Sequence, residues 1–213
     1  EAVQFGAGVS NDQVGSWLVA ELDFNSGRPE FPAFPFPHVL TVSVHLLDST
    51  VRISTSVRPT SDAEVPVAFG WHPYFAPPGG DRQDWTVCKP FTHHLVLDER
   101  CVPTGEVERV PVEVDVLGDP SQGGVVFDDL FDEVPVGTTA WIEGGQHRIT
   151  LSYDEGYSYA VLFAPPDQPL VAIEPMTAPT DPLSGHFPIT TAKPGESYSA
   201  TYGIHITESG VSA

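Results

Sequence analysis

The chain has 213 residues, of which 40% are hydrophobic and 18% are charged. This apolar fraction is enough to build a core, and the length suits a single all-β domain spanning residues 1–213. Nine Lys and Arg residues against 29 Asp and Glu residues give a formal net charge of −20, which repels phosphate backbones and anionic lipids. We therefore expect a protein that binds neither nucleic acid nor a membrane surface.

The sequence indicates neither a membrane-spanning segment nor a disulfide framework. The apolar runs are too short to span a bilayer, and no basic-then-apolar signal opens the chain, so we expect a cytoplasmic protein. Cys88 and Cys101 are the only cysteines, and they form no C-x-x-C pair. We expect two unpaired thiols rather than a disulfide framework or a zinc site.

The first predicted elements follow a Phe-Pro segment at residues 31–37, which contains three Phe. Such a segment is either a polyproline recognition element or a rigid lead-in that packs its rings on the next strands, and we favour the lead-in. Apolar residues then alternate along residues 38–46 and, after a turn at 48–50, along residues 51–57. This period of two predicts a β-hairpin over residues 38–58.

The rest of the chain continues the β pattern. Alternation recurs at residues 110–116, 139–153 and 198–206, and two apolar runs at 157–163 and 170–173 are separated by Pro165-Pro166-Asp167. A Pro-Pro-Asp sequence is strong turn chemistry. No window of a dozen residues carries a helical stripe, and Pro interrupts many candidates. The sequence therefore predicts an all-β fold, either a sandwich or a large antiparallel sheet.

One segment with chemical potential runs from Gly70 to Phe75 and reads Gly-Trp-His-Pro-Tyr-Phe. Pro73 favours an extended conformation for His72, so that the imidazole can be presented to a cleft. Trp71 and Tyr74 offer flat faces that suit the C–H side of a sugar. The alternative is a structural histidine that is hydrogen-bonded within an aromatic core.

Two further segments contain candidate carboxylates. Asp128 and Asp129 lie between Phe residues, and form either an acidic binding rim or a solvated loop; the EF-hand pattern is absent. Glu174 ends an apolar run that should be a buried strand. Partial burial would raise the pKa of this carboxyl group and make it a base near neutral pH, whereas the alternative is an edge Glu that pairs with an Arg.

Other chemistry is poorly represented. His93 and His94 are adjacent, and neighbours on a strand point to opposite faces, so they are weak candidates for a shared metal site. The chain has no G-x-S-x-G, P-loop, H-E-x-x-H or G-x-G-x-x-G motif. The usual signals of serine hydrolases, P-loop NTPases, zincins and dinucleotide enzymes are therefore missing.

Taken in order, residues 69–75, 127–131, 173–177 and 193–197 resemble the aldose 1-epimerase (galactose mutarotase-like) family, and the resemblance extends over about residues 34–206. It implies a β-supersandwich fold and the interconversion of α and β anomers of free aldoses such as galactose and glucose. By the same resemblance, Glu174 matches the general base, His72 the general acid, and Asp128 the acid that binds sugar hydroxyls, with Asp129 as the fallback. It implies a monosaccharide substrate, no metal and no other cofactor.

The resemblance has two departures. Family members normally carry a further N-terminal segment, so we expect this chain to be either a fragment or a shortened relative. A missing strand would leave an exposed sheet edge, and a homodimer formed through that edge is a hypothesis. Trp71 stands where the galactose mutarotase form usually has Asn, and His-Pro-Tyr-Phe also occurs in hexose-6-phosphate epimerases. Arg82 is the candidate phosphate contact in that case. The low count of basic residues favours a free sugar.

Two other functions compete with the epimerase. One is a non-catalytic carbohydrate-binding sandwich in which Trp71, Tyr74 and Trp141 provide stacking faces. The other is a glycosidase that uses Asp128 and Glu174, for which the two carboxyl groups would need a defined separation.

Overall fold

A computed structural model describes residues 6–10, 15–182 and 187–209. The described residues contain no α-helix, and short 3-10 turns lie at Phe31–Ala33, Arg82–Asp84 and Pro120–Gln122. The strands form one nine-stranded, one six-stranded and one two-stranded sheet, and all their pairings are antiparallel. The all-β prediction is confirmed.

The larger sheet contains, in spatial order, β1 (Gly6–Ser10), β2 (Ser16–Phe24), β3 (His38–Leu47), β4 (Thr50–Pro59), β17 (Tyr198–Glu208), β13 (His147–Glu155), β12 (Thr139–Gly144), β7 (Thr86–Lys89) and β10 (Glu113–Val116). The smaller sheet contains β6 (Tyr74–Phe75), β15 (Val171–Met176), β14 (Tyr159–Ala164), β11 (Phe127–Phe131), β8 (His93–Leu97) and β9 (Pro103–Arg109). The third sheet pairs β16 (Thr190–Ala192) with β5 (Val65–Val67).

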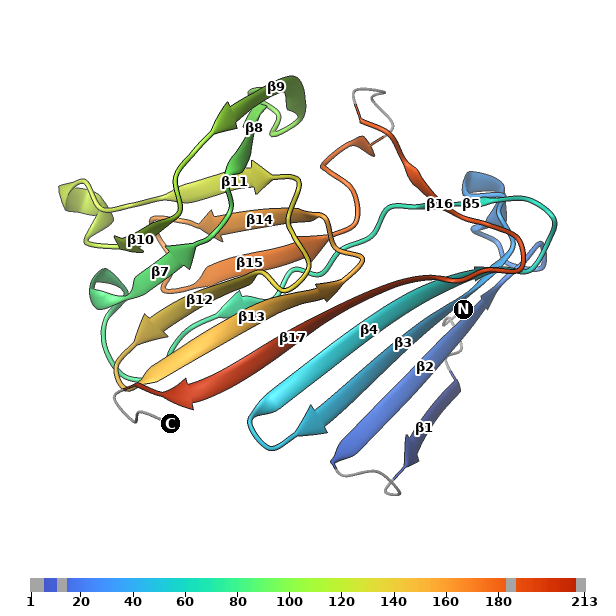
Figure 1. The fold of residues 1–213 in the computed structure, drawn as a ribbon, viewed down its shortest axis with the longest axis horizontal. Coiled ribbons are helices and arrows are strands. Elements are labelled where there is room, and N and C mark those ends of the chain that lie inside the picture. The colour runs from blue at the N-terminus through green and yellow to red at the C-terminus, as the bar shows by residue number, and fades with distance from the viewer. Residues whose placement is uncertain (1–5, 11–14, 183–186, 210–213) are drawn as a thin grey trace.

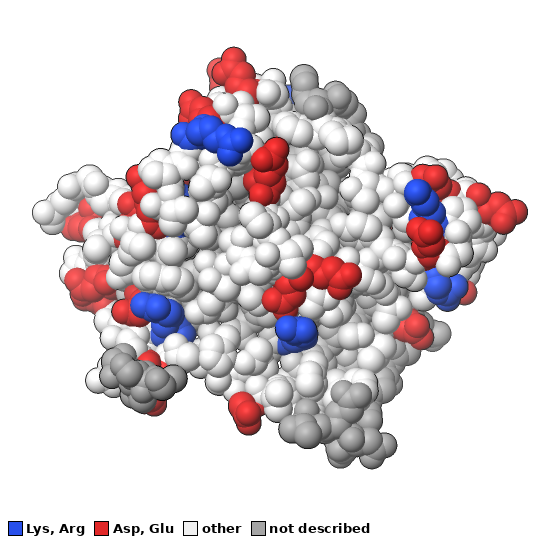
Figure 2. Space-filling model, in the orientation of Figure 1, with Lys and Arg blue, Asp and Glu red and all other residues white. Residues whose placement is uncertain are grey.

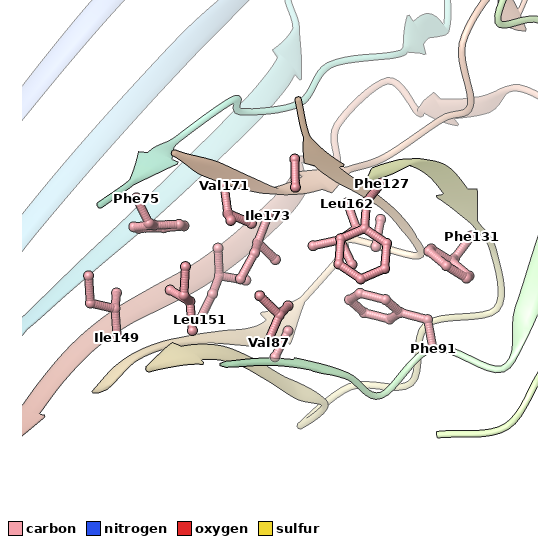
Figure 3. Close-up of a cluster of buried hydrophobic side chains, with 14 of the residues drawn as sticks. Phe75, Val87, Phe91, Phe127, Phe131, Ile149, Leu151, Leu162, Val171 and Ile173 are labelled. Carbon is pink, nitrogen blue, oxygen red and sulfur yellow. The ribbon is translucent and has the colours of Figure 1, made fainter. Parts of the chain in front are cut away.

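The main core lies between the two large sheets. Figure 3 shows Phe75, Val171 and Ile173 from the smaller sheet facing Ile149 and Leu151 from the larger one. These residues occupy alternate positions of their strands, so that one face of each sheet is removed from water. The alternation that predicted the strands therefore has its physical cause in this shared apolar layer.

The larger sheet extends beyond the smaller one. In Figure 1 the strands β1 to β4 lie to one side, and β17 joins them to the β12–β13 hairpin. The predicted hairpin over residues 38–58 corresponds to β3 and β4. Phe34 and Phe36 pack against a second small core that includes Val57 and Val65, which confirms the Phe-Pro segment as a lead-in.

The strand β10 departs from the expected pattern. Val112, Val114 and Val116 are more than half exposed, while Asp115 lies opposite buried Val87. The valines are exposed because β10 is the edge strand of the larger sheet and they point to its outer face. Period-two alternation identifies the strand, but it does not say which face is buried.

The surface agrees with the composition. Figure 2 shows acidic side chains spread over the visible face, with few basic ones among them. Cys88 and Cys101 are both free thiols, as expected. Within the described ranges, no helix has the length and apolar character needed to cross a membrane.

Candidate active site

The candidate site is built around Glu174, on the strand β15. Its neighbour Ile173 is fully buried in the core between the sheets, so Glu174 points to the opposite face of the smaller sheet. The residue is only 8% exposed. Burial and, to a lesser degree, the negative charge of Asp128 raise the pKa of Glu174 to about 7. A carboxyl group with this pKa can hold or release a proton near neutral pH.

The segment that carries His72 is tied to β15 by backbone hydrogen bonds. The Trp71 amide donates to the Pro175 carbonyl at 3.1 Å, and the Thr177 amide donates to the Phe69 carbonyl at 2.9 Å. Gly70 forms a bridge with Met176, and a Cβ at Gly70 would lie 2.8 Å from the Met176 side chain. Glycine is therefore needed for this close approach.

As a result, His72 and Glu174 are in direct contact. The Nε2 atom of His72 lies 2.9 Å from Oε1 of Glu174, and the imidazole side chain remains 48% exposed. The Tyr74 ring stacks on the imidazole with 4.5 Å between centroids, and Phe163 approaches with its ring at 6.3 Å. The site thus pairs an imidazole with a carboxyl group, between which a proton can be shared, and the imidazole of His72 is open to a ligand.

A cavity of about 280 Å³ opens over this pair. Asp128 enters it from β11, because Asp128 lies opposite Phe163 and on the same face as Glu174. The residues that line the cavity are His72, Tyr74, Leu97, Cys101, Asp128, Asp129, Leu130, Val161, Phe163, Glu174, Met176 and Thr180. The volume lies just below the range of about 300–1,000 Å³ that is usual for small-molecule sites.

Asp129 borders the same cavity but has a different partner. Its Oδ1 atom lies 3.2 Å from Nε2 of His94, since neighbouring residues on β11 face opposite sides of the sheet. Burial raises the pKa of the Asp129 carboxyl group, although His94 and Lys89 oppose this change. The structure therefore brings His72, Tyr74, Glu174 and Asp128 together with their side chains facing one space.

The expected roles of Trp71 and Arg82 need correction. Trp71 points into the core, where its indole N–H donates to Oγ1 of Thr55 at 3.1 Å, and it does not line the cavity. Arg82 is 9% exposed and its guanidinium donates to three backbone carbonyls, at Gly118, Val125 and Ala164. Both side chains are occupied by structural contacts, so neither is available to a sugar in this cavity.

Trp141 also lies elsewhere. It is on the larger sheet and stacks beneath the guanidinium of Arg148, 4.1 Å from the ring centroid. It does not line the cavity, so the stacking role considered for it has no support here.

The sequence reasoning missed several lining residues, of which Cys101 is the most informative. Its Sγ atom lies 3.7 Å from Oδ2 of Asp128. Cys101 has a positive φ of 57° in the turn between β8 and β9. Nothing in the sequence spacing links this cysteine with an aspartate 27 positions later, because only the β8–β11 pairing brings the two strands together.

In the described part of the chain, no group of three or more His, Cys, Asp and Glu side chains is arranged to hold a metal ion.

Comparison with known proteins assigns the family. The family model for aldose 1-epimerase matches residues 13–205. The chain therefore belongs to the aldose 1-epimerase family, and the matched region includes His72, Asp128 and Glu174. A search of curated proteins found no match.

Solved structures share the fold. A galactose mutarotase-like protein from Clostridium acetobutylicum is 22% identical with a TM-score of 0.80, and the alignment covers 96% of this chain and 67% of that one. A Synechocystis protein is 21% identical with a TM-score of 0.75, at 95% and 65% coverage. An aldose epimerase homologue from C. elegans is 14% identical with a TM-score of 0.75, at 95% and 69% coverage. This chain thus spans about two thirds of their length.

Proposed function

We propose that this protein interconverts the α and β anomers of free aldohexoses by general acid–base ring opening. The observation that carries the proposal is the 2.9 Å contact between Nε2 of His72 and Oε1 of Glu174 beneath a cavity that also holds Asp128. Ring opening needs one proton removed from the anomeric hydroxyl and one delivered to the ring oxygen. The pair can supply both transfers.

Glu174 acts as the base. Its carboxylate takes the proton from O1 of the sugar, the C1–O5 bond breaks, and the C1–O1 bond becomes a carbonyl. With a pKa of about 7, Glu174 is partly ionised at neutral pH and its conjugate acid can return the proton on ring closure. A carboxyl group at its ordinary pKa would be ionised more fully but would be a weaker base.

His72 acts as the acid. Its protonated imidazole delivers a proton to O5 as the C1–O5 bond breaks, which gives the open-chain aldehyde. Rotation about C1–C2 presents the other face of the carbonyl group. Closure then reverses both transfers: His72 takes the proton from the O5 hydroxyl, and Glu174 returns one to O1. The reaction is redox-neutral and leaves both residues in their starting protonation states.

Asp128 binds the sugar. A carboxylate accepts hydrogen bonds from two neighbouring hydroxyl groups, and this is a common requirement in sugar recognition. Asp128 is exposed to the cavity, so it can hold the rest of the sugar while the bond between C1 and C2 rotates beside His72 and Glu174. Tyr74, Phe163 and Met176 offer apolar surface for the C–H face of the sugar.

The charge around the cavity favours a neutral sugar over a sugar phosphate. All nine Lys and Arg residues lie in described parts of the chain, and none is among the residues that line the cavity. Asp128, Asp129 and Glu174 instead give it a negative character. A phosphate group would meet repulsion here without a guanidinium or ammonium partner.

Polarimetry tests the proposal. The protein should accelerate the mutarotation of freshly dissolved α-D-glucose and α-D-galactose, and it should have little effect on glucose 6-phosphate. Absence of acceleration by the folded protein would overturn the enzymatic proposal. If calorimetry then detected binding of the same sugars, a carbohydrate-binding function would replace it.

A further inference from the structure

His72 contacts two oxygen atoms through a single nitrogen. Nε2 lies 2.9 Å from Oε1 of Glu174 and 3.4 Å from the hydroxyl oxygen of Tyr74. One ring nitrogen either carries a proton and donates it, or has a lone pair and accepts one hydrogen bond. The carboxyl group and the phenol therefore compete for the same position, and the protonation state of Nε2 decides between them.

Tyr74 is held where it can serve as the second partner. It belongs to β6 and lies opposite Ala172 on β15, two residues before Glu174 and on the same face of the sheet. Its ring is tilted by 31° against the imidazole, with 4.5 Å between the centroids. Since Tyr74 is 55% exposed, water can satisfy its hydroxyl group whenever His72 does not.

The two protonation states of Nε2 have different preferences. When Nε2 carries a proton, the nearer Glu174 carboxylate is the stronger acceptor, because a charge-assisted bond is favoured. When Nε2 has lost its proton, the lone pair requires a donor, and the Tyr74 O–H is 3.4 Å away. In the proposed reaction, His72 reaches this second state each time it delivers a proton to the ring oxygen. Glu174 then carries the proton from O1 and directs it back to that oxygen, which leaves the Tyr74 hydroxyl group as the donor to Nε2.

We propose that Tyr74 is a positioning residue for His72: its hydroxyl group donates to Nε2 once the imidazole has released its proton, and its ring holds the imidazole plane. This inference rests on the proposed function for its role in turnover, but the contact itself exists without substrate. A hydrogen bond to the neutral form of a histidine favours that form. The hydroxyl group therefore gives the Nε2 lone pair a hydrogen-bond partner after the proton has left.

The other groups around His72 must be considered in any pH experiment. From β15 it faces Glu174, and from β11 it shares the cavity with Asp128 and Asp129. The turn after β8 contributes Cys101, and Phe163 on β14 contributes an apolar ring. Replacing the Tyr74 hydroxyl group leaves all of these charges in place, so a change in the NMR signal of the His72 ring can be attributed to the lost hydrogen bond.

The test compares Tyr74→Phe, which keeps the ring, with Tyr74→Ala, which removes it. NMR of the ligand-free protein follows the His72 ring signal, assigned by its absence in His72→Gln. We expect Tyr74→Phe to change the His72 ring signal at a pH where Nε2 carries no proton, and to lower kcat by about 2- to 10-fold with little change in KM. Tyr159→Phe, which removes a hydroxyl from β14 outside the cavity, is the matched control.

The two readouts separate the possible failures. If Tyr74→Phe gives the same His72 ring signal and the same turnover as the unchanged protein and only Tyr74→Ala is impaired, the ring alone matters and the inference is overturned. If the unchanged protein does not accelerate mutarotation, the proposed function fails, and the NMR signal of the His72 ring still decides whether the hydroxyl group binds His72. Because Tyr74 is exposed, both variants should keep the fold.

Discussion

The histidine–carboxylate contacts of His94 and His72 lie at the smaller sheet in different surroundings. His94, on β8, has carboxylates at both ring nitrogens: Oε2 of Glu108 is 3.4 Å from Nδ1, and Oδ1 of Asp129 is 3.2 Å from Nε2. His72 makes its contacts with Glu174 and Tyr74 through Nε2 and is about half exposed. The imidazole of His94 is occupied by two anions, whereas that of His72 borders a cavity.

The carboxyl groups of the two pairs differ in the same way. Burial raises the pKa of both Glu174 and Asp129. The charge of Asp128 adds to the effect of burial on both pKa values, but only for Asp129 do positive charges, those of His94 and Lys89, oppose it. The residue types alone therefore do not define the site. A cavity and an unbalanced negative charge distinguish the His72–Glu174 pair, to which we assign the proton transfers, from the contacts of His94, which link β8 to β9 and β11.

The largest expected effect is on turnover in Glu174→Gln. The amide cannot accept the proton from O1, so kcat should fall by about 10²- to 10⁴-fold. Glu108→Gln, which makes the same change beside His94, should keep kcat within about threefold. Polarimetry on α-D-glucose measures both variants. Equal losses would show that the two pairs do not differ as the comparison requires.

The second prediction compares variants in which either His72 or His94 is replaced by Gln. His72→Gln should lower kcat by about 10²-fold or more while the protein remains folded, because it removes the proton donor to O5. His94→Gln should leave kcat nearly unchanged and lower the free energy of unfolding by about 1 kcal/mol, since it weakens two partly exposed ion pairs. Polarimetry measures kcat and urea unfolding measures the free energy of unfolding for each of the two variants. A loss of turnover in His94→Gln alone would reverse the assignment.

The third prediction concerns the acidic limb of the pH profile. The proposed reaction requires ionised Glu174, so kcat/KM should rise with pH through about 7, the pKa of this group. Asp128→Asn removes a negative charge that raises this pKa, and the limb should move to lower pH. KM should also rise by about tenfold through the loss of charged hydrogen bonds to the sugar. A limb that stays in place would contradict the electrostatic coupling.

The fourth prediction links Glu174 to stability. Its folded-state pKa of about 7 exceeds the ordinary value of 4.5, so the folded protein binds more protons than the unfolded chain between these values. The contribution of this group is therefore present below about pH 4.5 and is lost as pH rises through about 7. Glu174→Gln should exceed the unchanged protein in unfolding free energy at pH 8 by about 1–3 kcal/mol. Urea denaturation at pH 5 should show a smaller difference.

The smallest predicted effect concerns Cys101. Asp128, the main cause, raises the pKa of this thiol, so Asp128→Asn should make alkylation by iodoacetamide a few times faster. Sugar should slow alkylation of Cys101, which lines the cavity, and leave Cys88 on the larger sheet unaffected as an internal control. Mass spectrometry of the two peptides gives both rates. Equal protection of the two thiols would argue against sugar binding in this cavity.

Much of the fold could be predicted from local patterns. Period-two alternation located β3, β4 and β17, and the Pro-Pro-Asp turn separated β14 from β15. The pattern failed at β10, where the valines point outward, because alternation carries no information about which side of an edge strand meets another layer.

Only part of the candidate site could be predicted from the sequence. The position of Glu174 at the end of an apolar run, together with the family resemblance, indicated the buried carboxyl group that the structure contains. Arg82 was misjudged, because nothing near it in the sequence shows that carbonyls from three separate segments surround its guanidinium. Trp71 was misjudged as well: next to His72 in an extended segment, it points to the opposite side.

The sequence by itself determined that this protein is built of strands and which short segments carry its acids and its histidine, because backbone periodicity and turn chemistry are local properties. The tertiary structure decided which of these groups meet. Strand register sets His72 against Glu174, directs Asp128 into the cavity and turns Asp129 toward His94. The pKa of about 7 at Glu174 also depends on the tertiary structure. Glu174 becomes buried and comes close to the charge of Asp128 only when β11, β14 and β15 pair.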